Sequence, residues 1–143
     1  MIVFYLDTCV LAAYYCPEPL SVAVGKALRH VTLPATSRLV ACELSSALSQ
    51  KVRSGELSRS SAGAVLAQFK KHLRDGHFRS VEIGPREYDL AEEWLNSFST
   101  PLRALDALHL AVAASHGLAL LTTDKALAVA AKSLGVQSKL ISA

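Results

Sequence analysis

The 143-residue sequence contains no apolar run long enough to span a membrane. It also lacks a basic segment followed by a small-residue cleavage site near its start, so we expect a cytoplasmic protein rather than an exported one. We find no internal repeat, low-complexity segment or linker, and we expect residues 1–143 to form one domain. Hydrophobic residues make up 51% of the chain, a share that excludes a disordered protein and allows a substantial core.

The three cysteines, Cys9, Cys16 and Cys42, form no CxxC pair and match no histidine spacing typical of zinc sites. An odd number of scattered cysteines in an intracellular chain indicates free thiols, which we expect in or near the core.

Acidic residues are in a small minority, with 12 against 15 lysines and arginines. The excess lies between Lys51 and Arg79, where the only acids are Glu56 and Asp75. A moderately basic surface suits a polyanionic partner, although solvated helix faces rich in lysine and arginine explain the same composition.

Short apolar segments alternate with helical patterns along the whole chain. The expected strands are residues 1–6, 32–36, 78–83, 118–121 and 136–141, and the expected helices are 8–15, 21–30, 38–53, 59–74, 86–98, 102–116 and 125–134. This alternation predicts an α/β domain with a central parallel sheet and helices on both faces. The helices 38–53 and 59–74, joined by a short turn with Gly55, form a protruding helical hairpin.

Two acids directly follow predicted strands. Asp7 comes after the first apolar run, and Asp124 comes after residues 118–121 and two threonines. Ligands of open α/β sheets bind at the carboxyl ends of the strands. Either acid has an alternative role as the N-cap of the helix that follows it.

Two further acids lie on predicted helices. Glu43 shares a helical face with Val40 and Ala47, at the edge of an apolar stripe, although it also suits a solvent-facing position. Asp106 falls in the middle of the helix 102–116, which is apolar nearly all round and should be buried. A buried carboxylate must be paired, protonated or metal-bound, and an ion pair with Arg103 is the alternative to a metal.

The carboxyl ends of parallel strands open on one edge of the sheet, so Asp7, Glu43, Asp106 and Asp124 are expected to converge there. Converging carboxylates repel one another unless cations lie between them. Hard divalent ions with oxygen ligands, Mg²⁺ or Mn²⁺, suit such a site and serve phosphodiester chemistry.

Four segments that contain these acids resemble the acidic motifs of PIN-domain ribonucleases. They are Leu6-Asp7-Thr8-Cys9-Val10-Leu11, Ala41-Cys42-Glu43-Leu44-Ser45-Ser46-Ala47-Leu48, Arg103-Ala104-Leu105-Asp106-Ala107-Leu108-His109-Leu110-Ala111 and Leu121-Thr122-Thr123-Asp124-Lys125-Ala126-Leu127. The short chain and the third segment look most like the VapC toxins of bacterial and archaeal toxin–antitoxin pairs.

The resemblance implies Mg²⁺- or Mn²⁺-dependent RNA cleavage, a homodimer, and inhibition by an antitoxin whose C-terminal segment lies across the acidic pocket. By motif match, Asp7, Asp106 and Asp124 would hold the ions, with Glu43 as a ligand or base. Thr122 matches a hydroxyl that orients a ligand or water, and Thr8 is a further supporting residue. Cys9 departs from the family, which commonly has Ser or Asn there, and a thiol is a poorer hydrogen-bond partner.

Basic side chains are candidates for salt-sensitive contacts to an RNA backbone. The expected set is Arg38, Lys51, Arg53, Lys70, Lys71 and Arg103. His109, one turn after Asp106, is expected to be a core histidine or to support the acids from behind rather than act as a general base. Trp94 and Phe98 are expected in the core rather than as base-stacking platforms.

A different class of function is a PIN-like module that binds RNA or a protein without cutting, for which Cys9 is the only sequence hint. Two other aspartate-using α/β folds fit poorly. A haloacid-dehalogenase phosphatase needs a second Asp two residues after the first, where this chain has Cys9, and a response-regulator receiver needs an acidic pair at the first strand end, where Asp7 stands alone.

Overall fold

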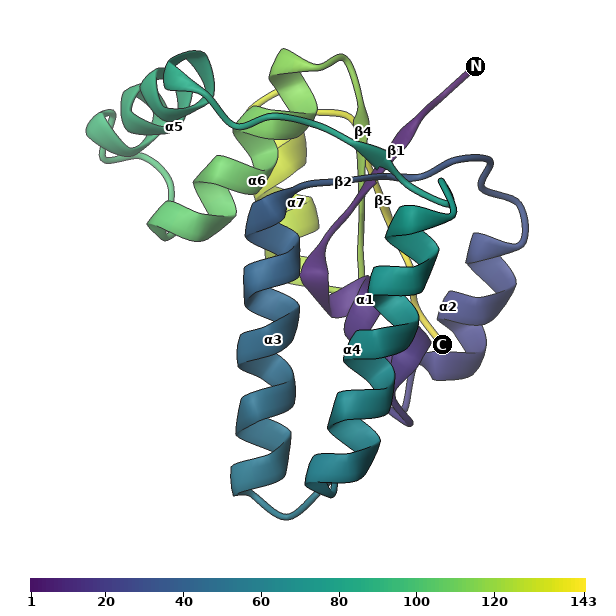
Figure 1. Ribbon diagram of the computed structural model, residues 1–143. Coiled ribbons are helices and arrows are strands. Elements are labelled where there is room, and N and C mark those ends of the chain that lie inside the picture. The colour runs from purple at the N-terminus through teal and green to yellow at the C-terminus, as the bar shows by residue number, and fades with distance from the viewer.

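The computed structural model describes all 143 residues as a five-stranded parallel sheet and seven helices (Figure 1). The strands are β1 (Phe4–Leu6), β2 (Ala35–Thr36), β3 (Arg79–Ser80), β4 (Ala119–Thr122) and β5 (Ser138–Leu140). The helices are α1 (Thr8–Tyr15), α2 (Ser21–Leu28), α3 (Arg38–Arg53), α4 (Arg59–Arg74), α5 (Pro85–Asn96), α6 (Ala104–Ser115) and α7 (Lys125–Ser133). The predicted fold class is confirmed.

The sheet has the strand order β3-β2-β1-β4-β5, and every pairing is parallel. β1 and β4 are central neighbours, with Leu6 opposite Leu121, and the Asp7 backbone N–H donates to the Leu121 carbonyl oxygen at 3.0 Å. Because parallel strands end at the same edge, the residues that follow β1 and β4 come out side by side.

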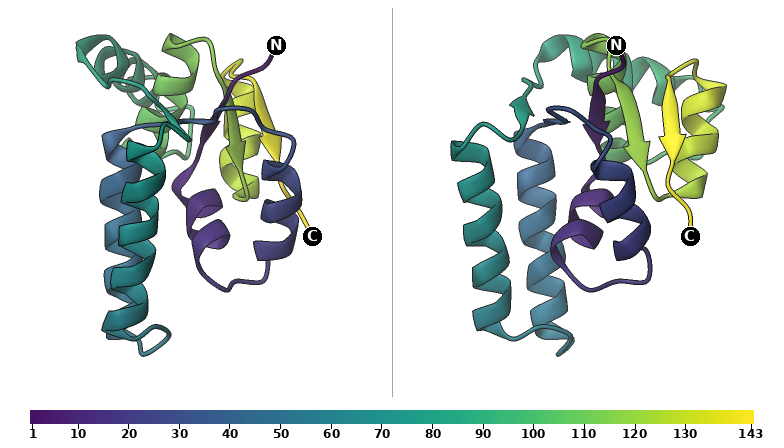
Figure 2. Two further views of the ribbon diagram at one scale, coloured as in Figure 1. Left: turned by 45° about the vertical axis from the view of Figure 1, so that its right-hand side comes forward. Right: turned by 90° about the vertical axis from the view of Figure 1, so that its right-hand side faces the viewer.

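Both central strands are buried, as expected for strands of a parallel sheet covered by helices. Tyr5, Leu6 and Leu120 have no exposed surface, and Leu121 has almost none. Figures 1 and 2 show helices flanking the sheet, with α6 and α7 on strands β4 and β5. None of the seven helices combines the length and apolar character that crossing a membrane requires.

The helices α3 and α4 form the predicted hairpin, which extends well beyond the sheet in both views of Figure 2. Each begins at a serine N-cap. Ser37 Oγ accepts from the Val40 N–H at 3.4 Å, and Ser58 Oγ accepts from the Ser61 N–H at 3.0 Å. Gly55 turns the chain with a φ of +82°, in the left-handed region that glycine tolerates.

Several expectations about burial or extent are wrong. α5 ends at Asn96, and Phe98 is 92% exposed in a left-handed conformation, whereas Trp94 does pack against the core. Cys42 is exposed on α3, although Cys9 and Cys16 are partly and fully buried. The strands β1, β2, β3 and β5 are shorter than predicted, because the sheet ladder stops where a neighbouring strand stops even if the apolar pattern continues.

α6 begins at Ala104 rather than at Leu102, since Arg103 has the extended backbone of an N-cap. Asp106 therefore lies in the first turn of the helix and is half-buried, which corrects the prediction of a mid-helix, fully buried position. The apolar pattern predicted the burial of the helix correctly from Ala107 to Ala113.

We expect the core at β4 to control stability. Leu120→Ala should lower the free energy of unfolding by about 2–5 kcal/mol, the range for truncating a fully buried leucine. Val129→Ala on α7 is the matched control, because Val129 is 64% exposed and its truncation should change stability by less than about 0.5 kcal/mol. Urea unfolding followed by circular dichroism measures both, and equal effects would contradict this assignment of the core.

Candidate active site

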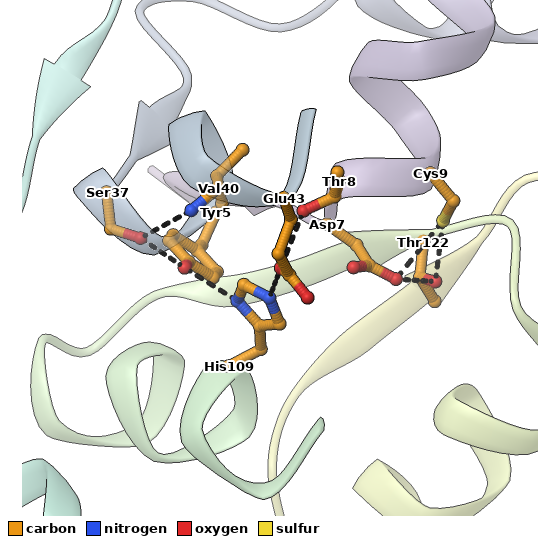
Figure 3. A network of polar contacts seen from close by, with 9 residues as sticks. All are labelled: Tyr5, Asp7, Thr8, Cys9, Ser37, Val40, Glu43, His109 and Thr122. Carbon is orange, nitrogen blue, oxygen red and sulfur yellow. Dashed lines mark hydrogen bonds and ion pairs between the residues drawn. The ribbon is translucent and has the colours of Figure 1, made fainter. Parts of the chain in front are cut away.

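Four elements deliver carboxylates to the edge of the sheet where β1 and β4 end. Asp7 follows β1, Asp124 follows β4, Glu43 lies in the second turn of α3 and Asp106 lies in the first turn of α6. Figure 3 shows the hydrogen-bond networks that hold Asp7 and Glu43.

Asp7 is 8% exposed and held through one oxygen. Its Oδ2 accepts from Thr122 Oγ1 at 2.8 Å and from Cys9 Sγ at 3.1 Å, while Oδ1 has no protein partner (Figure 3). Thr122 in turn accepts from the Asp124 N–H at 2.9 Å, which ties the two strand ends together. Although Asp7 stands at the N-cap of α1, its side chain caps no N–H of that helix, so the capping alternative fails here.

Cys9 supplies a hydrogen-bond donor to Asp7. Burial first, and the charge of Asp7 second, raise the pKa of the Cys9 thiol to about 11. The group therefore stays protonated at neutral pH and donates its S–H to Asp7.

Glu43 is held by two donors on the same oxygen. Thr8 Oγ1 donates to Oε1 at 2.8 Å, and His109 Nε2 contacts that oxygen at a short hydrogen-bond distance. Burial raises the pKa of Glu43, but the hydrogen bonds from His109 and Thr8 act against it, and the net pKa is lowered. Glu43 is thus an ionised carboxylate whose Oε2 has no protein partner.

Asp124 is exposed and does cap α7, since its Oδ1 accepts from the Leu127 N–H at 3.1 Å. Asp124 can cap α7 and also bind a ligand, because the capping hydrogen bond fixes one carboxylate oxygen and leaves the other free.

Asp106 has no hydrogen bond and no ion pair, and the alternative pairing with Arg103 is absent. Burial raises its pKa most, followed by the negative charges of Asp7 and Asp124, with a smaller contribution from Glu43. All three other acids therefore lie close enough to Asp106 to repel its charge. This repulsion and the placement of the acids beside the ends of β1 and β4 both favour the predicted convergence.

The donor set fits a hard divalent cation, because it consists of carboxylate oxygens and the partner-free Asp106 faces like charges. As the side chains stand, no three of them come close enough together to form a ready-made metal cage. Asp7 and Asp124 each keep one oxygen without a protein partner, which leaves ligand atoms available for an ion that draws the carboxylates together.

The proposed RNA contacts fall into two groups. Arg38 begins α3 and Arg103 caps α6, so both lie on elements that carry a site acid, and both are exposed without an ion pair. The others lie on the hairpin, and three of them are engaged within the protein: Lys51 with Glu18 and Glu56, Lys71 with Asp75, and Arg53 with Ser49. Lys70 is exposed. Contact of these six with RNA stays a prediction.

Two residues of the site were not predicted from the sequence. Tyr5 and Ser37 hydrogen-bond through their side-chain oxygens, and Tyr5 reaches His109, which lies buried behind Glu43 as expected (Figure 3). A tyrosine in an otherwise apolar strand was the one available signal, because a buried Tyr hydroxyl needs a partner.

The structure thus defines the class of the protein: an α/β domain with four acids around the carboxyl ends of its central strands. The sequence model of the PIN domain family matches residues 4–133, and the chain belongs to that family. The predicted family is confirmed, and the dehalogenase and receiver alternatives are excluded. No curated protein sequence matches the chain.

Solved structures with the same fold include several toxin–antitoxin proteins. VapBC2 from Rickettsia felis, bound to a promoter DNA fragment, matches with a TM-score of 0.72 at 14% identity over 99% of this chain and 100% of that chain. Mycobacterium tuberculosis VapC20, a sarcin–ricin loop cleaving toxin, matches with a TM-score of 0.69 at 18% identity over 89% and 94%. PAE2754 from Pyrobaculum aerophilum has 26% identity and a TM-score of 0.62 over 96% and 90%.

Removing one charge from the site should stabilise the metal-free protein. Asp106→Asn should raise the free energy of unfolding in chelator by about 1 kcal/mol or less, given solvent screening of a half-exposed group. The folded-state pKa of Asp106 is raised, so the folded protein binds the proton first as the pH falls, and the gain should shrink on acidification. Urea unfolding at two pH values measures this, with exposed Asp89→Asn as the control. A destabilised Asp106→Asn protein would contradict the repulsion.

Thiol reactivity should follow burial. At pH 8, Cys42 should react quickly with an aromatic disulfide reagent, and Cys9 should react about 100-fold more slowly than an ordinary thiol, because its raised pKa lowers its thiolate fraction. The Cys42→Ser protein should lose the fast phase, and all remaining thiols should react in denaturant. A fast phase that survives in Cys42→Ser would show that Cys9 or Cys16 is accessible.

Proposed function

We propose that this protein is a metal-dependent endoribonuclease and the toxin of a toxin–antitoxin pair. The observation that carries the proposal is the convergence of Asp106 with three other carboxylates and with no lysine or arginine paired to any of them. A protein that folds against this repulsion has a use for the charge, and binding of divalent cations is the use that the oxygen donors support.

Asp7, Asp106 and Asp124 would hold Mg²⁺ or Mn²⁺. A bound ion of this kind supplies positive charge at a phosphodiester and lowers the pKa of water at the site. Glu43, ionised and with Oε2 free, accepts the proton of the attacking water. The water oxygen forms a bond to phosphorus, the bond from phosphorus to the leaving oxygen breaks, and solvent protonates the leaving group.

The identity of the substrate and partner rests on the relatives. Structures of VapBC and FitAB complexes share the fold, and VapC20 is described as a toxin that cleaves the sarcin–ricin loop. These likenesses support RNA as the substrate and a cognate antitoxin as the partner. A homodimer and a cytoplasmic location complete the proposal as expectations from the sequence. The competing hypothesis, a non-cutting binding module, rested on Cys9, which here keeps its hydrogen bond to Asp7.

The first experiment incubates total cellular RNA with the purified protein in Mg²⁺ or Mn²⁺. We expect discrete fragments that disappear in chelator. Asp7→Asn should lower the rate on the order of 100-fold or more, the size of losing one charge-stabilising group at a transition state. Asp89→Asn, which changes an exposed carboxylate of α5, should leave the fragments unchanged.

The other outcomes discriminate between explanations. Equal cleavage by the Asp7→Asn protein would mean a contaminating nuclease or a wrong site. Metal binding by calorimetry without cleavage of any RNA would support the binding module instead.

A further inference from the structure

A buried chain of hydrogen bonds runs from the start of α3 to the back of Glu43 (Figure 3). Ser37 Oγ and the Tyr5 hydroxyl are 2.8 Å apart, and the Tyr5 hydroxyl lies 2.8 Å from His109 Nδ1. His109 Nε2 then contacts Glu43 Oε1. Tyr5 has no exposed surface, and His109 and Ser37 are 1% and 2% exposed, so water does not compete for these groups.

The direction of each hydrogen bond follows from counting donors. Glu43 is ionised and accepts, so the His109 nitrogen that faces it, Nε2, carries a proton. Ser37 Oγ already accepts from the Val40 N–H, and the Tyr5 hydroxyl is the only acceptor within reach of the Ser37 hydroxyl hydrogen. Tyr5 therefore accepts from Ser37 and donates its own hydrogen to Nδ1. Every hydrogen of the chain has a partner when His109 is neutral.

The reverse direction leaves an unsatisfied group. If Nδ1 also carried a proton, Tyr5 would accept from it and donate to Ser37, whose hydroxyl hydrogen would then be buried without an acceptor. A buried donor without a partner is costly, which favours the first arrangement.

These hydrogen bonds determine the orientation of the Glu43 carboxylate. The His109 N–H and the Thr8 hydroxyl both occupy Oε1, so the carboxylate cannot rotate without breaking two hydrogen bonds. Its Oε2 stays free, and in Figure 3 it lies on the side of Asp7. The chain thus sets the orientation of one oxygen at the acidic site.

We propose that Ser37, Tyr5 and His109 form a positioning relay that fixes neutral, Nε2-protonated His109 against Glu43 and so presents Glu43 Oε2 to the attacking water. The role in catalysis rests on the proposed nuclease function, whereas the tautomer and direction of the relay do not. None of the three residues contacts substrate, so each acts through Glu43.

Nitrogen NMR of ¹⁵N-histidine-labelled protein tests the relay without any activity. The His109 signals, assigned by comparison with His109→Gln, should show a neutral ring with protonated Nε2 and an Nδ1 that accepts a hydrogen bond. In Tyr5→Phe the Nδ1 signal should shift toward that of a nitrogen without a hydrogen bond. A doubly protonated ring, a proton on Nδ1, or the averaged signals of a free histidine in the wild-type protein would overturn the relay.

Kinetics on RNA test the catalytic consequence. Tyr5→Phe should lower kcat about 10- to 100-fold with little change in KM, as for other groups that orient a site residue from behind. Tyr15→Phe is the matched control, because the Tyr15 hydroxyl also contacts a histidine Nδ1, that of His72 at 2.7 Å, but leads to no site acid. It should keep the wild-type kcat. His109→Gln, which keeps an N–H for Glu43, should retain more activity than His109→Leu.

The NMR and kinetic experiments together distinguish failure of the relay from failure of the nuclease function. An inactive wild-type protein with the expected His109 tautomer would reject the nuclease and keep the relay. Active protein with equal kcat in the Tyr5→Phe and Tyr15→Phe variants, both folded by circular dichroism, would reject the positioning role.

Discussion

Repulsion among Asp7, Glu43, Asp106 and Asp124 is the constraint on which the rest of this structure depends. No lysine or arginine is paired with any of them. Neutral donors hold three of the acids instead: Thr122 and Cys9 at Asp7, Thr8 and His109 at Glu43, and a backbone N–H at Asp124. A neutral donor orients a carboxylate without cancelling its charge, so the negative potential that attracts a cation survives. Asp106 has no partner, and burial first and the charges of Asp7 and Asp124 second raise its pKa.

The parallel sheet brings together the two acids that follow its central strands, Asp7 and Asp124. β1 and β4 are neighbours although 115 residues separate Asp7 from Thr122, and both strands end at the same edge. Because the buried strands β1 and β4 pair in register, their ends are joined by a hydrogen bond, which the Asp7 N–H donates to the Leu121 carbonyl oxygen. The apolar core therefore supplies the free energy that holds the acids together, and the site is as rigid as the centre of the sheet.

The sequence predicted the parts that depend on local pattern and on strand ends. The fold class, the helical hairpin, the family and the burial of His109 are confirmed by the structure and the family match. Asp106 was misplaced because apolar periodicity does not show where a helix starts, and the extended backbone of Arg103 decides that. Phe98 was misplaced because α5 ends before it. The Ser37–Tyr5–His109 contacts join residues up to 104 positions apart, and only the tertiary structure reveals such pairs.

A histidine behind Glu43 suits the need to keep the acidic site negative. A lysine or arginine in that position would orient the carboxylate equally well, but its permanent charge would neutralise Glu43 and weaken the attraction of the site for a cation. An imidazole kept neutral by a tyrosine that donates to Nδ1 provides one directed hydrogen bond and no net charge. Ser37 completes the arrangement, because its hydroxyl occupies the acceptor side of Tyr5 and leaves the tyrosine hydrogen only one direction. In this protein, three buried polar residues make a carboxylate rigid while leaving it fully negative.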